Sequence, residues 1–348
     1  MSRTAQPSDA ASEAETARAK GRRPVRGYAA LVLAGRRHGE DSLAQAAGAP
    51  HRALLDIHGT PMLERVLRTL AATPCIDHIV VSIDEPRLLD RFPGIAALRA
   101  ASGAQIVVVR ATDSPSQSVL AILDDGSSDQ PVLVTTADHA LLDVAMVEYF
   151  LGQAEARGGD VAVGLVASAV LRERFPESRR TYLGFADERY SGANLFSFQT
   201  PRARRAVDFW KRAESFRKRP WRLVASFGAR ALFLFLTRRL SLEEAFAEVT
   251  RALDARVFPI VMPWAEAAVD VDKLSDLELV RRVLADAAEP KLEPEVESPR
   301  PDESPEPEAG LEGDPSAGRQ QEPSAGPGAE SDQSGRSPSA TKPPVSPS

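Results

Sequence analysis

The sequence has little cysteine, few histidines and no long apolar run. Its one cysteine, Cys75, excludes an intramolecular disulfide framework and fits a reducing compartment, so we expect a cytoplasmic protein. The five histidines are scattered and offer no spacing suited to a zinc site. The most apolar stretch, 223–236, is broken by Arg230 and is too short to span a bilayer. Residues 1–26 lack the apolar core of a secretory signal.

The net charge of −6 is spread unevenly. Residues 289–348 hold 13 acidic and 5 basic residues and 13 of the 27 prolines, which predicts a disordered acidic tail. Residues 1–26 are small, polar and mildly basic, and we expect them to be disordered too. Residues 27–288 are left as the folded domain. That domain is close to neutral, so we expect no nucleic-acid partner.

Apolar runs alternate with amphipathic segments through the first half of this domain. The strands expected there are 28–34, 78–83, 105–109, 131–137 and 160–167, and the helices are 61–72, 116–125 and 143–156. Near-continuous Val, Ile and Leu runs between helices indicate a parallel sheet covered on both faces. The sequence therefore predicts an α/β domain with a Rossmann-like, doubly wound, mostly parallel sheet.

The second half is less regular. We expect antiparallel strands at 180–185 and 192–198, and a basic helical insertion at about 201–253. Within it, Ser241 and Glu244 form a capping-box pattern for a helix over 241–253. A strand at 255–262 and a helix at 275–287 complete the domain.

The loop after the first strand is rich in glycine and arginine. It contains Gly35, Arg36, Arg37 and Gly39, and Arg52 follows. Glycine lets the backbone approach a phosphate closely, and arginine neutralises phosphate with paired donors. Because ligands of open α/β sheets bind beyond the carboxyl ends of the strands, this loop is a candidate phosphate site. The alternative is a solvated basic turn.

The order of residues 28–67 resembles the opening of nucleotidyltransferases of the glycosyltransferase-A-like fold. The branch it resembles is that of molybdenum cofactor guanylyltransferase and related MobA-like NTP transferase domains. The matching positions are Leu33, Ala34, Gly35, Arg37, Arg52, Leu54, Gly59, Pro61 and Leu63. Two positions depart from the pattern: Arg36 replaces a usual glycine and Arg52 a usual lysine. The resemblance implies that 33–36 bind the nucleotide and that Arg37 and Arg52 neutralise its phosphates during catalysis.

Two aspartates match metal-binding positions of these families. Asp138 ends the apolar run "PVLVTTAD", and Asp272 ends "AAVDVD" before a helix, in whose first turn Asp276 complements the dipole. Carboxylates with phosphate oxygens suit Mg²⁺. Asp138 could instead cap the following helix, although we expect that helix to begin at Asp143. The resemblance thus implies an Mg²⁺-dependent transfer from an NTP to a small-molecule acceptor.

Six further residues are candidates for recognising the base or the acceptor. In relatives the base is read by loops after the second strand and before the fourth, which here hold Asp84, Asp113, Gln117 and Ser118. A carboxylate there could accept from the N1 and N2 hydrogens of guanine. Gly192 and Asn194 match a segment that lines the acceptor side. Ordinary loop, capping and strand roles are the alternatives for all six.

The basic section 202–239 contains 12 basic and 2 acidic residues with interleaved aromatics. It is a candidate for peripheral contact with an anionic membrane. The alternative is a helical insertion that packs its aromatics on the core. Two other functions compete with nucleotidyl transfer: a nucleotide-sugar glycosyltransferase, and a catalytically weakened scaffold. The sequence shows only one aspartate at 137–140, where glycosyltransferases usually have Asp-x-Asp. It leaves the oligomeric state open.

Overall fold

The computed structural model describes residues 27–36, 41–101, 105–125, 130–214, 233–234, 237 and 239–288. All of them belong to the first of two units into which the chain divides, residues 1–291. The expected disordered segments 1–26 and 289–348 lie outside the described residues, as do Arg37 and most of 215–239. Among the described helices, none is both long and apolar enough to cross a bilayer.

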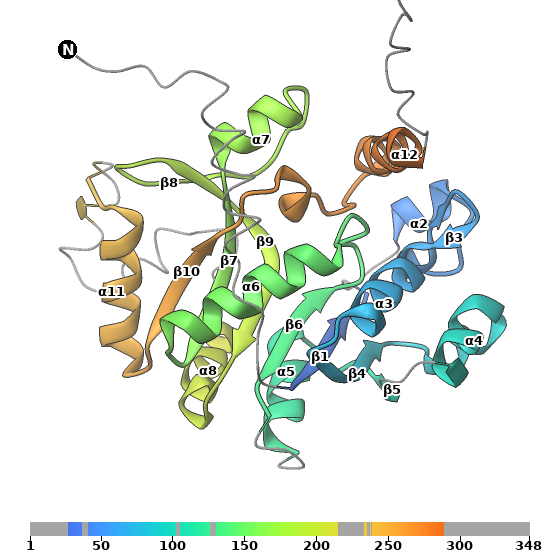
Figure 1. Cartoon of the computed structure of the whole chain (residues 1–348), viewed down its shortest axis with the longest axis horizontal. Helices are drawn as coiled ribbons and strands as arrows, with labels where there is room; N and C mark the ends of the chain where they lie inside the picture. The colour runs from blue at the N-terminus through green and yellow to red at the C-terminus, as the bar shows by residue number, and fades with distance from the viewer. Residues whose placement is uncertain are drawn as a thin grey trace, which may run out of the picture. The chain divides into compact units, whose positions relative to one another are not determined.

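An eight-stranded sheet forms the centre of the domain, in the order β10-β7-β9-β6-β1-β4-β5, with β8 paired to β9 (Figure 1). The strands are β1 (Tyr28–Leu33), β4 (Ile76–Ile83), β5 (Gln105–Arg110), β6 (Val132–Thr136), β7 (Val161–Ala167), β8 (Leu183–Gly184), β9 (Arg189–Phe198) and β10 (Val257–Val261). β2 (Asp56–Ile57) and β3 (Thr60–Pro61) make a separate hairpin. The mostly parallel, doubly wound sheet is confirmed, because β1 pairs in parallel with β4 and β6. β9 runs antiparallel between β6 and β7, as expected.

Helices cover both faces of the sheet (Figure 1). They are α2 (Ser42–Ala46), α3 (Met62–Ala72), α4 (Pro93–Ala101), α5 (Pro115–Asp124), α6 (Val144–Arg157), α7 (Ser168–Arg174), α8 (Arg204–Glu214), α11 (Leu242–Leu253) and α12 (Leu274–Ala288). Short 3₁₀ turns are η1 (Arg52–Leu54), η2 (Pro86–Arg91), η3 (Pro201–Ala203) and η4 (Ala265–Ala268). Alternate residues of β1 serve the two cores: Ala30 and Val32 face the α3 and α6 side, and Leu31 faces the α5 and α8 side.

One strand is much shorter than the sequence predicts. The expected strand 180–185 is reduced to β8, Leu183–Gly184. Arg180 is turned inward, and its side chain is 6% exposed. Only Leu183 and Gly184 pair with β9, so the expected strand does not extend back to Arg180.

The described part of the basic insertion packs on the domain. Trp210 of α8 stacks on Phe196 with ring centroids 5.6 Å apart. Arg204 forms ion pairs with Asp124 and Asp208, and Arg205 pairs with Asp254. Phe209 and Trp210 therefore pack against the core and these arginines have acidic partners, as in the packed-insertion alternative, whereas Phe233 is exposed. α11 begins with the expected capping box between Ser241 and Glu244.

Asp160 joins the chain segments that flank β7, β9 and β10, at the end of the sheet opposite the site, and its loss should destabilise the fold. Its carboxylate is 2.6 Å from the N–H of Arg256, and it also accepts from the Thr200 hydroxyl. Asp160→Ala leaves these donors without a partner, so we expect the free energy of unfolding to fall by about 2 kcal/mol. Asp160→Asn keeps one acceptor oxygen and should lose less. Urea denaturation measures both, and equal losses would contradict this role.

Candidate functional site

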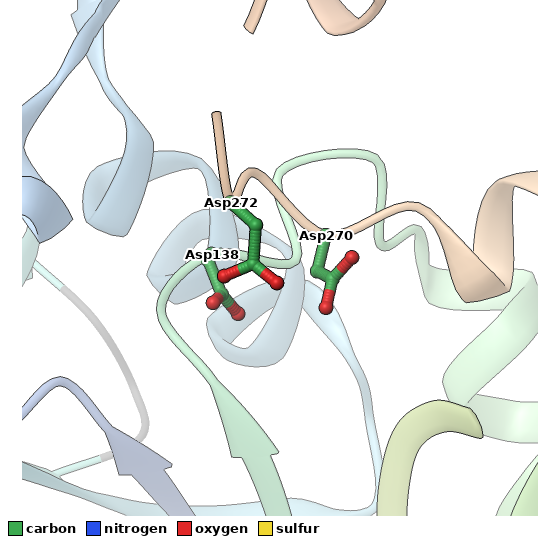
Figure 2. Close-up of side chains that lie close together, drawn as sticks. All are labelled: Asp138, Asp270 and Asp272. Carbon is green, nitrogen blue, oxygen red and sulfur yellow. The ribbon is translucent and has the colours of Figure 1, made fainter. Parts of the chain in front are cut away.

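Three carboxylates meet where β6 ends. Asp138 follows β6, and Asp270 and Asp272 lie on the segment between η4 and α12. One carboxylate oxygen from each lies within 4.8 Å of the others. Figure 2 shows this grouping between the end of β6 and the segment leading to α12. The structure therefore brings the two predicted aspartates together and adds Asp270, which the sequence analysis missed. Its signal was the Asp-x-Asp spacing, because alternate residues of an extended segment share a side.

Hydrogen bonds fix the backbone that carries Asp272. The N–H of Val271 donates to the Asp138 carbonyl at 3.1 Å. Arg52 Nη2 lies 2.7 Å from the Val271 carbonyl and 2.8 Å from Asp272 Oδ1. Asp276 Oδ2 accepts from the N–H of Asp272 at 3.1 Å. Asp276 thus takes its expected place in the first turn of α12, and Arg52 holds the acidic segment.

Asp270 is held by two further residues. Arg180 Nη1 donates to the Asp270 carbonyl at 3.0 Å and forms an ion pair with its carboxylate. Asn194 Nδ2 lies 3.4 Å from Asp270 Oδ2. Asn194 has a φ of 49°, at a point where the register of β9 against β7 shifts. Asparagine tolerates this left-handed conformation better than most residues, and the shift turns its side chain toward the carboxylates.

The charge and burial of the three aspartates suit a bound cation. Burial raises the pKa of Asp138 to about 6, and the nearby Asp270 carboxylate adds to the rise, while the Thr136 hydroxyl and, less strongly, Arg52 oppose it. Burial also raises the pKa of Asp270. Asp138 Oδ1 is buried without a hydrogen-bond partner among the described residues. A buried oxygen without a donor, beside two further carboxylates, fits a small hard cation such as Mg²⁺.

The candidate phosphate loop begins directly after β1. Ala34 is buried, whereas Gly35 and Arg36 are exposed. A β-carbon on Gly35 would lie 3.3 Å from that of Ala111, tighter than most such contacts, so the loop has little room for a side chain there. The Arg36 guanidinium contacts the Pro50 carbonyl at 3.0 Å and Glu85 at 3.1 Å. The loop is thus held close to the end of β4.

Asp84 supports this loop from the end of β4. Its Oδ2 accepts the N–H of Arg36 at 2.6 Å and lies 3.3 Å from His51 Nε2. His51 Nδ1 accepts from the N–H of Ala53 at 3.0 Å, so the neutral ring carries its proton on Nε2 and donates to Asp84. Burial lowers the pKa of His51, which favours this neutral form. His51 was not among the predicted site residues.

The remaining predicted residues differ in exposure and in their hydrogen-bond partners. Asp113 is exposed in the loop before α5. The N–H of Gln117 is capped by Ser114, and the buried Ser118 hydroxyl contacts those of Ser82 at 3.1 Å and Thr112 at 2.9 Å. Gly192 is exposed, and a β-carbon there would meet nothing within 4 Å. Asp113 and Gly192 are therefore open to a ligand, whereas the Ser118 hydroxyl has structural partners.

A separate groove of about 1380 Å³ lies between α3, α6, η4 and α12. Tyr149 and Trp264, which pack edge to face with centroids 5.3 Å apart, contribute to its lining. None of the three site aspartates lines it. We therefore do not assign the nucleotide to this groove.

Residues 30–177 match the model of the MobA-like NTP transferase domain family. The match confirms the resemblance seen in the sequence for these residues. The match includes the phosphate loop, Arg52 and Asp138 and ends before Arg180 and the Asp270–Asp272 segment. Among curated protein sequences, none matches this chain.

Several solved structures are similar. A hypothetical transferase from Thermus thermophilus is 28% identical with a TM-score of 0.60, covering 72% of this chain and 99% of its own. A CMP:2-keto-3-deoxy-manno-octonic acid synthetase solved with CTP is 16% identical with a TM-score of 0.45, covering 75% and 100%. A 4-diphosphocytidyl-2C-methyl-D-erythritol synthase from Anaerococcus prevotii is 12% identical with a TM-score of 0.45, covering 75% and 99%. The first likeness, together with the strand order, confirms the fold.

The raised pKa of Asp138 makes the cation-free protein sensitive to pH. Because the folded-state pKa of about 6 exceeds the ordinary value, the folded state binds more protons than the unfolded state between about pH 4 and 6. This carboxyl therefore lowers stability as the pH rises through that window. We expect Asp138→Asn to raise the free energy of unfolding by about 2 kcal/mol at pH 7.5, and to have little effect at pH 4.

Urea denaturation in EDTA at several pH values measures this difference. The control is Asp113→Asn, which removes an exposed carboxylate and should leave stability unchanged at each pH. If the Asp138→Asn protein is no more stable than wild type at pH 7.5, ionisation of Asp138 does not destabilise the folded protein and the expectation is wrong.

Proposed function

We propose that this protein is an Mg²⁺-dependent nucleotidyltransferase that transfers NMP from an NTP to a phosphorylated small-molecule or cofactor acceptor and releases pyrophosphate. The observation that carries the proposal is the meeting of Asp138, Asp270 and Asp272 beside the loop after β1. A cation-binding group and a glycine-arginine loop at one edge of a parallel sheet suit a metal-bound triphosphate. The single buried thiol, Cys75, fits the cytoplasm.

In this reaction an oxygen of the acceptor attacks the α-phosphorus of the NTP in line. The new bond joins that oxygen to the α-phosphorus, and the bond from the α-phosphorus to the bridging oxygen breaks, so pyrophosphate leaves with the electron pair. A bound Mg²⁺ would neutralise charge that develops on the phosphate oxygens. No side-chain nucleophile is needed, since positioning and charge stabilisation supply the catalysis.

The described residues divide this work between the two sides of the site. Gly35 after β1 allows a close approach of the triphosphate, and the exposed Arg36 follows it directly in the loop. Arg52 orients Asp272 from a half-buried position, with 20% of its side chain exposed. Arg37 belongs to the same proposal but lies outside the described residues. Asn194 and Gly192 form the proposed acceptor side.

The proposed donors are GTP or CTP. Asp113 is exposed before α5, where base recognition is expected. Its carboxylate can accept from the N1 and N2 hydrogens of guanine, or from the N4 amino group of cytosine. Asp84, in contrast, already accepts from Arg36 and His51, so we assign it to holding the phosphate loop.

Nucleotide binding tests the proposed function directly. We expect GTP or CTP with Mg²⁺ to stabilise the protein by ~2.7 kcal/mol at a hundredfold excess over the dissociation constant. Asp138→Asn should abolish most of the effect of Mg²⁺ on this stabilisation. Thermal unfolding with each of the four NTPs, with and without Mg²⁺, makes the measurement. If no nucleotide raises the melting temperature of the wild-type protein, the proposed function is wrong.

Two aspartates should differ in how they affect nucleotide choice. Asp84→Ala frees the N–H of Arg36 and loosens the phosphate loop, so we expect the dissociation constants of all bound NTPs to rise by a similar factor, about tenfold. Asp113→Ala removes a contact to the base and should change the ratio between the preferred NTP and the others. Calorimetric titration of each variant measures these constants. A uniform loss in Asp113→Ala would remove it from base recognition.

A further inference from the structure

Arg180 is a buried arginine between α7 and β8, beyond residues 30–177 that match the family model. Its side chain is 6% exposed. Burying a guanidinium is costly unless charged partners and hydrogen bonds offset the loss of water. Its partners therefore indicate what Arg180 stabilises.

Those partners are the two ends of the acidic segment. Nη1 donates to the carbonyl of Asp270 at 3.0 Å and pairs with the Asp270 carboxylate. Nη2 lies 3.5 Å from Asp276 Oδ1. Nε donates to Ser178 Oγ at 3.2 Å, which fixes the plane of the guanidinium. Arg180 thus joins Asp270 to Asp276 in the first turn of α12.

The position of Asp276 extends this effect to Asp272. Asp276 Oδ2 accepts from the N–H of Asp272 and from that of Lys273 at 3.2 Å, while its Oδ1 faces Arg180. Movement of Arg180 would therefore release Asp270 directly and loosen the backbone of Asp272 through Asp276. Arg52 holds the same segment at Val271 and Asp272. Two arginines together hold carboxylates that would otherwise repel each other at this distance.

We propose that Arg180 is a positioning residue for the cation site, fixing Asp270 as its third carboxylate and, through Asp276, the place of Asp272. The site so built takes a small hard divalent cation such as Mg²⁺ or Mn²⁺. This inference rests on the proposed function, because it assigns the carboxylates to a cation. Arg180 is not a catalytic residue: its side chain is buried, and it acts through Asp270 and Asp276.

A second role for Arg180 would predict the opposite result. If it only screened the negative charge of the cluster, its removal would raise the affinity for a cation. If Arg180 positions Asp270, removal of Arg180 lowers the affinity for a cation. Mutation of a residue that holds a metal ligand commonly lowers metal affinity by about 10–100-fold. Cation affinity therefore distinguishes the two roles.

The test measures Mn²⁺ binding to the full chain without nucleotide, by the electron paramagnetic resonance signal of free Mn²⁺. We expect Arg180→Met to raise the dissociation constant by about tenfold or more, and Asp270→Asn to do likewise. The double variant should lose less affinity than the two single losses combined, because part of the effect of Arg180 passes through Asp270. Arg180→Lys keeps the charge but cannot make all the contacts, so its affinity should be intermediate.

The matched control is Arg174→Met. Arg174 lies in the same region and pairs with Glu266 at 3.1 Å, but its side chain is 55% exposed and touches none of the three aspartates in the contacts described. We expect the Arg174→Met protein to bind Mn²⁺ with the dissociation constant of the wild type. Melting temperatures check that each variant is folded; if Arg180→Met is not, Arg180→Lys decides.

Unchanged or tighter Mn²⁺ binding in folded Arg180→Met, or wild-type binding in Arg180→Lys, overturns the positioning role. Failure of the wild-type protein to bind Mn²⁺ overturns it too. Failure of the proposed function is seen separately, as the lack of stabilisation by any NTP. A protein that binds Mn²⁺ but no NTP would lose the transferase proposal and keep the role of Arg180.

Discussion

The rest of the site depends on one constraint: three carboxylates are held within 4.8 Å of one another at the edge of a sheet. Like charges at that distance repel, and burial adds to the cost of keeping them ionised. The chain offsets this with Arg52 and Arg180, which reach the acidic segment from different parts of the sequence. The hydrogen bond from Val271 to the Asp138 carbonyl then joins that segment to the end of β6. The raised pKa of Asp138 is the strain that remains.

The arginine at position 52 departs from the lysine that the resemblance implies there, and this has a physical consequence. Arg52 Nη2 contacts both the Val271 carbonyl and the Asp272 carboxylate, and its planar fork leaves other donors available. An ammonium group is a compact charge with three donors and lacks this fixed planar geometry. Arg52 therefore holds the acidic segment, in addition to the phosphate role that the resemblance implies. Under the proposed function, neutralisation of the triphosphate would then depend more on the loop after β1.

The sequence predicted the sheet, its cover on both faces and two of the three clustered aspartates, because each of these follows from local apolar runs and the ends of strands. It did not predict Asp270, Arg180 or His51. The roles of these residues come from contacts with distant segments, such as Arg180 with Asp270 and His51 with Asp84. Local alternation made 180–185 look like a strand, whereas only Leu183–Gly184 pairs with β9 and the Arg180 side chain pairs with the acidic segment.

Comparison of Asp84 with Asp138 indicates which carboxylate is available for chemistry. Both follow a parallel strand at the same edge of the sheet. Asp84 accepts hydrogen bonds from the N–H of Arg36 and from His51, so its charge is used to fix the phosphate loop. Asp138 has a buried oxygen without a donor among the described residues, and its pKa is raised. A carboxylate oxygen without a donor is stabilised most by a bound cation. A carboxylate that already accepts two hydrogen bonds, such as Asp84, would have to lose them to bind a cation.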